Sequence, residues 1–273
     1  MSNNQKYVLV TGAASGIGFT ITEYLSAKGD YVIATDVNKE ALSKLNGKNN
    51  ISTIYLDVTH KESIQKAAQE IIKLTDGLDG LVNNAGLFVG GSLVEIAEEK
   101  VEKIFSVNVT GVQKVTKGLF PLLLKKKGRI VNIGSEAGRL AFPMNGPYSM
   151  TKFALEAFSD SLRRELMFLD MKVVHLQVGA MDTPLLDITY SSYTNDTDQE
   201  KTLFKNLLKT VVTTCEGEKT RCAKPIEVAK VVYKALHKKR PKIRYRVKNN
   251  RGRRMLEFLP TRLFDNSMRK YLK

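Results

Sequence analysis

The stretch YVLVTGAASGIG, from Tyr7 to Gly18, decides how the rest of the chain is interpreted. Its four apolar residues predict a buried strand, and the glycines that follow interrupt regular structure. A glycine-rich turn that opens a helix lets backbone amides approach a pyrophosphate, and the helix start adds a partial charge of roughly +0.5. We expect Gly12 to make the tight turn, Gly16 the close approach and Gly18 the helix–strand contact. The triplet alone also fits other tight turns.

Apolar runs of strand length alternate with helix-periodic stretches along most of the chain. This alternation predicts a doubly wound, Rossmann-like α/β fold: a parallel sheet of about seven strands, covered by helices on both faces, in one domain over 1–273. Strands are expected at 6–11, 30–36, 51–57, 78–86, 128–135, 171–179 and 242–247. Helices are expected at 16–28, 38–45, 61–74, 95–126 with a break at 108–111, and 148–169.

Residues 184–224 lack the strand rhythm and are interpreted as a substrate lid or specificity insertion. Their apolar side chains could line a pocket or pack a lid helix over the core; they are Leu185, Leu186, Ile188, Tyr190, Tyr193, Leu203, Phe204, Leu207 and Leu208. This composition favours a lipophilic alcohol or ketone, of steroid, retinoid or acyl type, over sugars and small polyols.

The net charge of +15 is concentrated in a basic C-terminal extension, residues 237–273. This extension holds 14 Lys/Arg and two acidic residues, whereas residues 1–236 carry a net charge of only +3. Two short helical pieces separated at Pro260 place apolar residues at three- and four-residue steps: Met255, Leu256, Leu259, Leu263, Phe264, Met268 and Leu272. Such a stripe could pack on the body or a second subunit, or lie on an anionic membrane; nucleic acid is disfavoured because stacking aromatics are sparse.

The remaining composition favours a cytoplasmic protein, peripherally membrane-associated if the extension binds lipid. No secretory signal is recognisable at the amino end, and no apolar run reaches the ~18 residues of a spanning helix. Cys215 and Cys222 are interpreted as reduced thiols. The three histidines, His60, His175 and His237, lack ligand spacing, so no metal site is expected and none receives a role.

Asp36 ends the second expected strand, about twenty residues after the glycines. A carboxylate there accepts hydrogen bonds from both ribose hydroxyls and repels a 2′-phosphate. No arginine adjoins it, and Ser15 in the turn is neutral, so NAD is expected rather than NADP. Asp36 could also cap the helix expected at 38–45.

A set of polar residues follows at ordered positions. Tyr148 and Lys152 are one helical turn apart, Ser135 ends the fifth expected strand, NNAG (83–86) ends the fourth, and Asn108 interrupts a helical stretch. Together with TGAASGIG and LDV (56–58), this set resembles the short-chain dehydrogenase/reductase family over roughly residues 6–185. Singly each residue has a structural explanation, as a core tyrosine, a solvated lysine or a cap; jointly these explanations require many coincidences.

The resemblance implies an enzyme that moves a hydride between nicotinamide and a secondary alcohol or carbonyl. Tyr148 is expected as acid/base, with Lys152 lowering its pKa by about 2 units, worth ~3 kcal/mol. The family further implies that Ser135 orients the substrate oxygen and that Asn108 holds a water in a relay to Lys152. It also implies the residues that contact the cofactor: Gly12, Ser15, Gly16, Ile17, Gly18, Asp36, Asp57, Val58, Asn83, Asn84, Ala85, Gly86, Tyr148, Lys152 and Thr183.

The chain departs from the family where Val178 stands in place of the proline before Gly179, although the spacing to Thr183 is kept. The family also implies a dimer or tetramer built on the helices at 101–126 and 148–169. The alternative function is a catalytically silent NAD-binding regulator or scaffold of the same fold. A basic nucleic-acid or membrane module that binds nucleotide incidentally ranks third, because it leaves Tyr148 and Lys152 unexplained.

Overall fold

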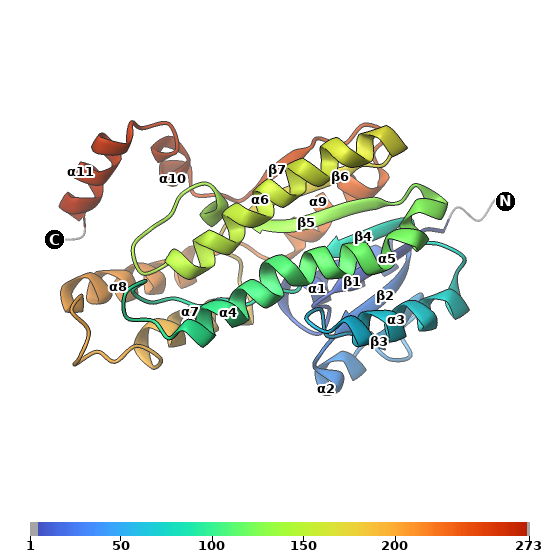
Figure 1. The fold of residues 1–273 in the computed structure, drawn as a ribbon, viewed down its shortest axis with the longest axis horizontal. Helices are drawn as coiled ribbons and strands as arrows, with labels where there is room; N and C mark the ends of the chain where they lie inside the picture. The colour runs from blue at the N-terminus through green and yellow to red at the C-terminus, as the bar shows by residue number, and fades with distance from the viewer. Residues whose placement is uncertain (1–4, 272–273) are drawn as a thin grey trace.

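The sheet contains all seven strands expected from the sequence. The structure is a computed structural model that describes residues 5–271. Its strands are all parallel and follow the order β3-β2-β1-β4-β5-β6-β7 (Figure 1). They are β1 (Tyr7–Thr11), β2 (Tyr31–Asp36), β3 (Ile51–Tyr55), β4 (Gly80–Asn83), β5 (Arg129–Ser135), β6 (Val173–Val178) and β7 (Arg244–Val247). The predicted doubly wound α/β fold is confirmed.

Helices cover both faces of the sheet, and strand alternation explains how. Val8 and Val10 of β1 belong to a core shared with α1 (Gly16–Ala27) and α9 (Ile226–His237). Leu9 points to the other face, into a core shared with α3 (Lys61–Leu74) and α5 (Val112–Lys126). Because both faces are buried, the central strands are continuously apolar, as expected for a parallel sheet.

The helical stretch expected to break at 108–111 does not break. Instead α4 (Glu98–Phe105) passes through a π-helical turn (Ser106–Gly111) directly into α5. The extra residue per turn lets the backbone continue while one side chain, that of Asn108, is redirected inward. Asn108 is only 1% exposed. The sequence therefore predicted the position of the helix irregularity correctly, but the irregularity is a π-helical turn and not a break.

The segments outside the regular α/β pattern lie beyond the carboxyl ends of the strands (Figure 1). Residues 184–224 form α7 (Pro184–Thr194) and α8 (Lys205–Arg221). The two short helices expected around Pro260 are α10 (Arg251–Leu256) and α11 (Thr261–Tyr271); Leu272 of the expected stripe lies outside the described residues. The long α6 (Gly146–Leu166) runs along the sheet, and the short α2 (Lys39–Ser43) follows β2.

The basic extension divides into two parts. Residues 237–247 join the body: β7 pairs with β6, and the carbonyl oxygens of Lys238 and Lys239 accept hydrogen bonds from Arg129 and Lys172. Only residues 251–271 project as a separate helical pair (Figure 1). Among the described residues, no helix is both long and apolar enough to span a bilayer.

Candidate active site

The turn between β1 and α1 accepts only glycine at two positions. Gly12 has a φ of +65°, and a Cβ there would lie 2.8 Å from the Cα of Ala85. A Cβ on Gly18 would collide with the Gly12 carbonyl oxygen. The Asn84 amide holds the turn by donating to the carbonyl oxygens of Thr11 (2.9 Å) and Gly12 (3.0 Å). The turn is therefore tight and fixed to the end of β4.

The amino end of α1 opens into a cavity. Ser15, Gly16 and Ile17 line it, and the Ser15 side chain makes no capping hydrogen bond, so the first N–H groups of the helix lack a side-chain acceptor. Thr183 closes the opposite wall, because a Cβ on Gly16 would come within 3.2 Å of the Thr183 Cβ. A close backbone and unpaired donors at a helix start fit a dinucleotide pyrophosphate.

Asp36 lies at the rim of the same cavity. Its Oδ2 accepts a hydrogen bond from the Ala14 N–H at 3.0 Å, and its Oδ1 accepts from the Asn38 N–H at 2.9 Å. The cap of α2 is Asn38, whose side chain accepts from the Ala41 N–H, so Asp36 is not needed for capping. The carboxylate is thus anchored by backbone and faces the cleft beside the glycine turn.

One cavity of about 1890 Å³ connects this rim with Ser135, Tyr148 and Lys152, three of the four predicted catalytic residues; Asn108 does not line it. Most of the residues assigned to the cofactor line it: Gly12, Ser15, Gly16, Ile17, Asp36, Asp57, Val58, Asn84, Ala85, Gly86, Tyr148, Lys152 and Thr183. Gly18 lies behind the turn. Asn83 does not line the cavity: it is 3% exposed and donates to Asn132 and Thr116 in the interior. Its side chain is therefore held in the interior, away from the cavity in which the implied contact with the cofactor would be made.

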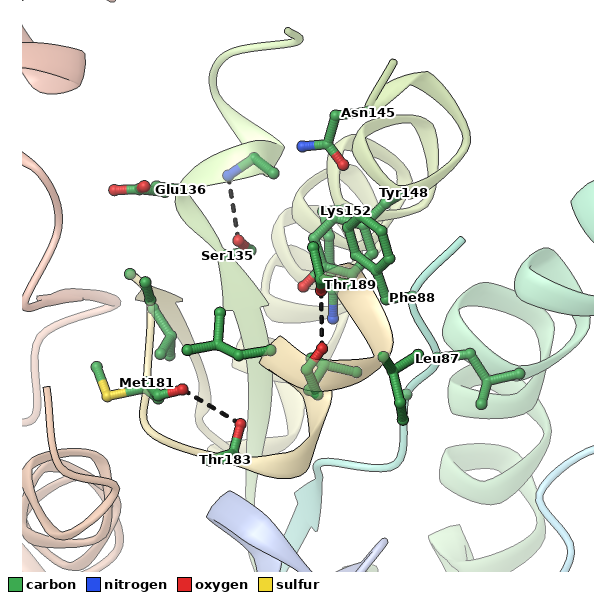
Figure 2. A pocket seen from close by; sticks show the side chains of 18 of the residues that line it. Leu87, Phe88, Ser135, Glu136, Asn145, Tyr148, Lys152, Met181, Thr183 and Thr189 are labelled. Carbon is green, nitrogen blue, oxygen red and sulfur yellow. Dashed lines mark hydrogen bonds between the residues drawn. The ribbon is translucent and has the colours of Figure 1, made fainter. Parts of the chain in front are cut away.

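Tyr148 and Lys152 project from the first turns of α6 to the same side (Figure 2). The Lys152 ammonium lies 5.4 Å from the centroid of the Tyr148 ring and donates to the Ile133 carbonyl oxygen at 3.2 Å. The tyrosine ring packs against Phe88, with ring centroids 5.0 Å apart. Helical spacing thus brings the phenol and the ammonium to one spot on the cavity wall, as the sequence predicted.

Burial shifts both groups toward their neutral forms. It raises the pKa of Tyr148 to about 12; Ser135 acts in the opposite direction through a hydrogen bond, and Glu136 adds to the rise. Although Tyr148 keeps some accessible surface, protein atoms surround it densely enough for burial to dominate. Burial also lowers the pKa of Lys152 to about 8. The expected lowering of the phenol pKa by Lys152 is therefore not what the protein alone produces, because burial is the largest influence on the Tyr148 pKa and raises it.

Asn108 lies one layer behind Lys152. Its Oδ1 accepts from the Leu87 N–H (2.8 Å), and its Nδ2 donates to the Leu87 carbonyl oxygen (2.9 Å) and the Thr151 hydroxyl (3.1 Å). Gly86 lies between Asn108 and Lys152: a Cβ there would be 3.4 Å from Asn108 Oδ1 and 3.9 Å from Lys152 Nζ. The π-helical turn and Gly86 together bring the asparagine oxygen near the ammonium.

Ser135 ends β5 at the cavity. Its hydroxyl accepts a hydrogen bond from the Ala137 N–H at 3.2 Å, so it caps the short 3-10 turn Glu136–Gly138. This structural role leaves the hydroxyl proton able to donate elsewhere. Ser135 and Tyr148 both line the cavity, and Ser135 acts to lower the pKa of Tyr148.

A buried polar network lies behind these residues, one turn further along α6. Glu156 accepts hydrogen bonds from Gln177 (2.6 Å) and Arg244 (2.8 Å), and its Oε1 lies 3.1 Å from His175 Nε2. Burial raises the pKa of Glu156, but the contacts with His175, Gln177 and Arg244 outweigh it and hold the pKa at about 2. His175 is a core residue, as expected from its apolar strand, and is 2% exposed.

The residues of α7 and α8 that line the cavity are both apolar and polar, with Lys209, Glu218 and Arg221 among the polar ones. Four of the nine candidate substrate residues line it: Leu185, Leu186, Ile188 and Tyr193. The others do not: Leu203 is 83% exposed, Tyr190 donates to Glu216, and Phe204, Leu207 and Leu208 pack in a cluster between α7, α8 and Met144. Both alternatives for this segment, pocket lining and lid packing, are thus realised by different residues.

The sequence did not point to several further lining residues, three of which are Phe88, Arg253 and Asn145. Phe88 stands on the loop after β4, and Arg253 reaches the cavity from α10. Asn145 lies three residues before Tyr148, and its buried Oδ1 has no hydrogen-bond partner within the described chain. Of these, only Asn145 could have been singled out from the sequence, because it lies close to Tyr148. Phe88 and Arg253 belong to segments whose packing cannot be predicted from a local sequence pattern.

The remaining predicted features are located as follows. His60 is the N-cap of α3, and His237 contacts Asp30 at 2.9 Å at the end of α9. Cys215 is buried and Cys222 is partly exposed, and neither is in a disulfide. Within residues 5–271, no group of three or more His, Cys, Asp or Glu side chains is arranged to hold a metal ion.

Comparisons with known proteins agree with this geometry. Residues 6–193 match the family model described as short chain dehydrogenase. The NADPH-dependent 3-dehydrocapnine reductase of Ornithobacterium rhinotracheale is 35% identical, over 98% of this chain and 98% of its own length. Retinol dehydrogenase 16 of Homo sapiens is 38% identical over 65% of this chain, which spans only 57% of that relative. A crystal structure of a short-chain dehydrogenase from Streptomyces avermitilis superposes with a TM-score of 0.77 at 29% identity, covering 99% of this chain and 96% of its own.

Proposed function

The chain belongs to the short-chain dehydrogenase family, NAD(P)-dependent oxidoreductases acting on CH–OH groups, and on this premise we propose that it uses NAD and a lipophilic secondary alcohol or ketone. The observation that carries the proposal is the single cavity. At one end are the glycine turn and Asp36, in the middle Tyr148 and Lys152, and at the other an apolar wall.

NAD would be held by the amino end of α1, with Asp36 at the adenosine ribose and Thr183 across from Gly16. When bound, NAD accepts the hydride and its nicotinamide brings a positive charge. A carboxylate fixed by two backbone N–H groups supports NAD over NADP, because it would repel a 2′-phosphate. The reductase relative is named NADPH-dependent, so cofactor preference is the point on which this chain is proposed to differ.

Tyr148 is proposed to exchange the proton of the substrate oxygen. It is the cavity-lining phenol closest to a buried ammonium, and Ser135 can donate a hydrogen bond to the same oxygen. With a pKa near 8, Lys152 can hold or release a proton near neutral pH, and Asn108 lies behind it for a water relay. A positive charge in the cavity would favour the phenolate, which burial alone disfavours.

The proposed substrate is lipophilic because Phe88, Leu185, Leu186, Ile188 and Tyr193 surround the far part of the cavity. The relative named retinol dehydrogenase acts, by its name, on such a molecule. Asn145, with its unpaired buried oxygen, is proposed to accept a hydrogen bond from a polar group on that substrate.

The test is a spectrophotometric screen of NAD and NADP reduction over steroids, retinoids, hydroxyacyl compounds and polyols. Turnover with NAD on a lipophilic alcohol, lost in Tyr148→Phe, supports the proposal. Tight NADH binding with no turnover on any class would instead favour the silent regulator or scaffold. A clear preference for polyols would contradict the assignment of the apolar wall.

A homo-oligomer is also proposed. Helices α5 and α6, and the 3-10 turn Met167–Leu169 that follows α6, expose large apolar residues in the segments where the family resemblance places subunit contacts: Leu124, Met150, Phe153, Met167 and Phe168. Light scattering of the purified protein should give a dimer or tetramer, and a monomer at micromolar concentration would refute this.

A further inference from the structure

The helical pair α10–α11 is fixed to the body along its inner side. Arg253 forms ion pairs with Glu136, beside Ser135, and with Glu218 of α8, and its guanidinium lies 5.2 Å from the centroid of the Phe142 ring. Glu257, whose side chain is 5% exposed, pairs with Arg246 at 2.7 Å. These contacts set which side of the pair faces the protein.

Apolar contacts complete the same inner side. Phe264 of α11 packs edge to face on Phe142, with ring centroids 6.2 Å apart. Leu256 and Met268 line the mouth of the cavity. The apolar stripe expected from the sequence is therefore divided, because Leu256, Phe264 and Met268 face the body whereas Met255, Leu259 and Leu263 are exposed.

We call the opposite side the outer face; its apolar members are Met255, Phe258, Leu259 and Leu263. They are 74%, 77%, 40% and 56% exposed. Large apolar side chains gathered in one short segment, while neighbours on the same helices are firmly packed, mark a contact surface rather than scattered exposure. The inner ion pairs prevent the pair from turning this face toward the body.

The charge around the outer face is almost entirely positive. Five exposed basic residues border it, Arg251, Arg254, Arg262, Arg269 and Lys270, against one exposed carboxylate, Asp265. The other charges of the pair, Arg253 and Glu257, are used in the inner contacts. A partner for this face must therefore accept apolar side chains and carry negative charge.

We propose that the outer face of α10–α11 docks on an anionic lipid bilayer. Apolar side chains enter the acyl boundary while the surrounding arginines and lysine meet lipid phosphates. A second copy of this chain is disfavoured, because a two-fold pairing would bring the same positive patch against itself. A nucleic acid offers phosphate but no apolar layer for Phe258 and its neighbours.

Docking in this way would bring the helical pair, whose inner side borders the cavity, to the membrane surface. Leu256 and Met268 belong to both the helical pair and the cavity lining. If the substrate is lipophilic, which rests on the proposed function, docking would hold the enzyme close to a bilayer in which that substrate dissolves. The docking itself does not depend on that function.

The test is co-sedimentation of the full-length protein with vesicles of phosphatidylcholine alone or mixed with phosphatidylglycerol. We expect binding to the anionic vesicles that weakens as salt rises. Phe258→Ser combined with Leu263→Ser should lower the vesicle partition coefficient about tenfold or more. The matched control replaces two apolar residues exposed elsewhere, Ile72 (59%) and Ile243 (52%), with serine and should bind like wild type.

The outcomes separate the explanations. Absence of binding to anionic vesicles, or equal loss in the test and control variants, overturns the proposal. Light scattering that shows the Phe258/Leu263 variant dissociating an oligomer, with vesicle binding unchanged, also overturns it and assigns the face to a second copy. Because no residue in the test touches the cavity, NADH binding should stay at wild-type level and serves as the folding check. Failure of the substrate screen would leave this result intact.

Discussion

Replacing Lys152 with methionine should abolish activity and yet stabilise the fold. Lys152 is 7% exposed, and burial lowers its pKa from 10.5 to about 8. At pH 7 the folded protein therefore carries a buried ammonium at a cost of about 3 kcal/mol, taking 1.36 kcal/mol per pKa unit. Methionine keeps the length of the stem and removes the charge. The lost hydrogen bond to the Ile133 carbonyl subtracts about 1 kcal/mol, so the net gain is about 2 kcal/mol.

The pH dependence supplies the decisive signature. Between about pH 8 and 10.5 the unfolded chain binds the Lys152 proton and the folded chain does not, so stability rises with pH in this window. From pH 7 to 9 this contributes about 1 kcal/mol in the wild type and nothing in Lys152→Met. Urea unfolding at both pH values measures the difference, with Lys73→Met on the exposed side of α3 as a control for the substitution itself.

Two results would refute this reasoning. If Lys152→Met unfolds at a lower urea concentration than wild type at pH 7, the ammonium is a favourable part of the native interior and not a strained one. If both proteins gain the same stability between pH 7 and 9, Lys152 does not titrate in that range. Either result would also remove the basis for treating Lys152 as a group that can lose its proton near neutral pH.

Three further predictions concern single residues. Tyr148→Phe should lower kcat by about 10²-fold to 10⁴-fold while leaving the Kd for NADH nearly unchanged in fluorescence titration; wild-type turnover would show that another group moves the proton. Asp36→Ala should lower the ratio of kcat/KM for NAD to that for NADP by about tenfold or more, because a charge-assisted hydrogen bond and a repulsion are both lost; an unchanged ratio would contradict the role of Asp36. Glu156 has its pKa held at about 2, so the native state loses about 2 kcal/mol from this group as pH falls from 7 to 3. Acid-induced loss of urea stability should be smaller by that amount in Glu156→Gln, and identical pH profiles would rule the network out.

Much of the fold was predictable because each strand is bounded by recognisable residues. A strand buried on both faces must be apolar throughout, and the turns that follow need glycine or polar residues, so β1, β2 and β5 could be located closely, whereas β4 is shorter than expected. The π-helical turn could not be predicted in form. Asn108 and Gly111 weaken a helix by propensity, and only the contact of Asn108 with Leu87 shows why the chain continues instead of breaking.

The site divides in the same way. Tyr148 and Lys152 are four residues apart on one helix, so their proximity could be predicted from the sequence. Arg253 lines the same cavity from a C-terminal helix more than a hundred residues later, which no sequence spacing indicates. The direction of the Tyr148 pKa shift was also beyond prediction. The sequence shows that a lysine lies near Tyr148. It does not show how completely the phenol and the ammonium are removed from water, and this removal decides whether the pKa of Tyr148 rises or falls.

The side-chain amide of Asn108 can take part in further hydrogen bonds in one way only. Both of its N–H hydrogens are already used, toward Leu87 and Thr151, and the Leu87 N–H fixes which end of the amide is oxygen. Only a lone pair on Oδ1 is left, so this residue can receive a hydrogen from a neighbour but can never give one. Any water that reaches this amide must therefore donate a hydrogen bond to it, which fixes the orientation of that water beside the π-helical turn.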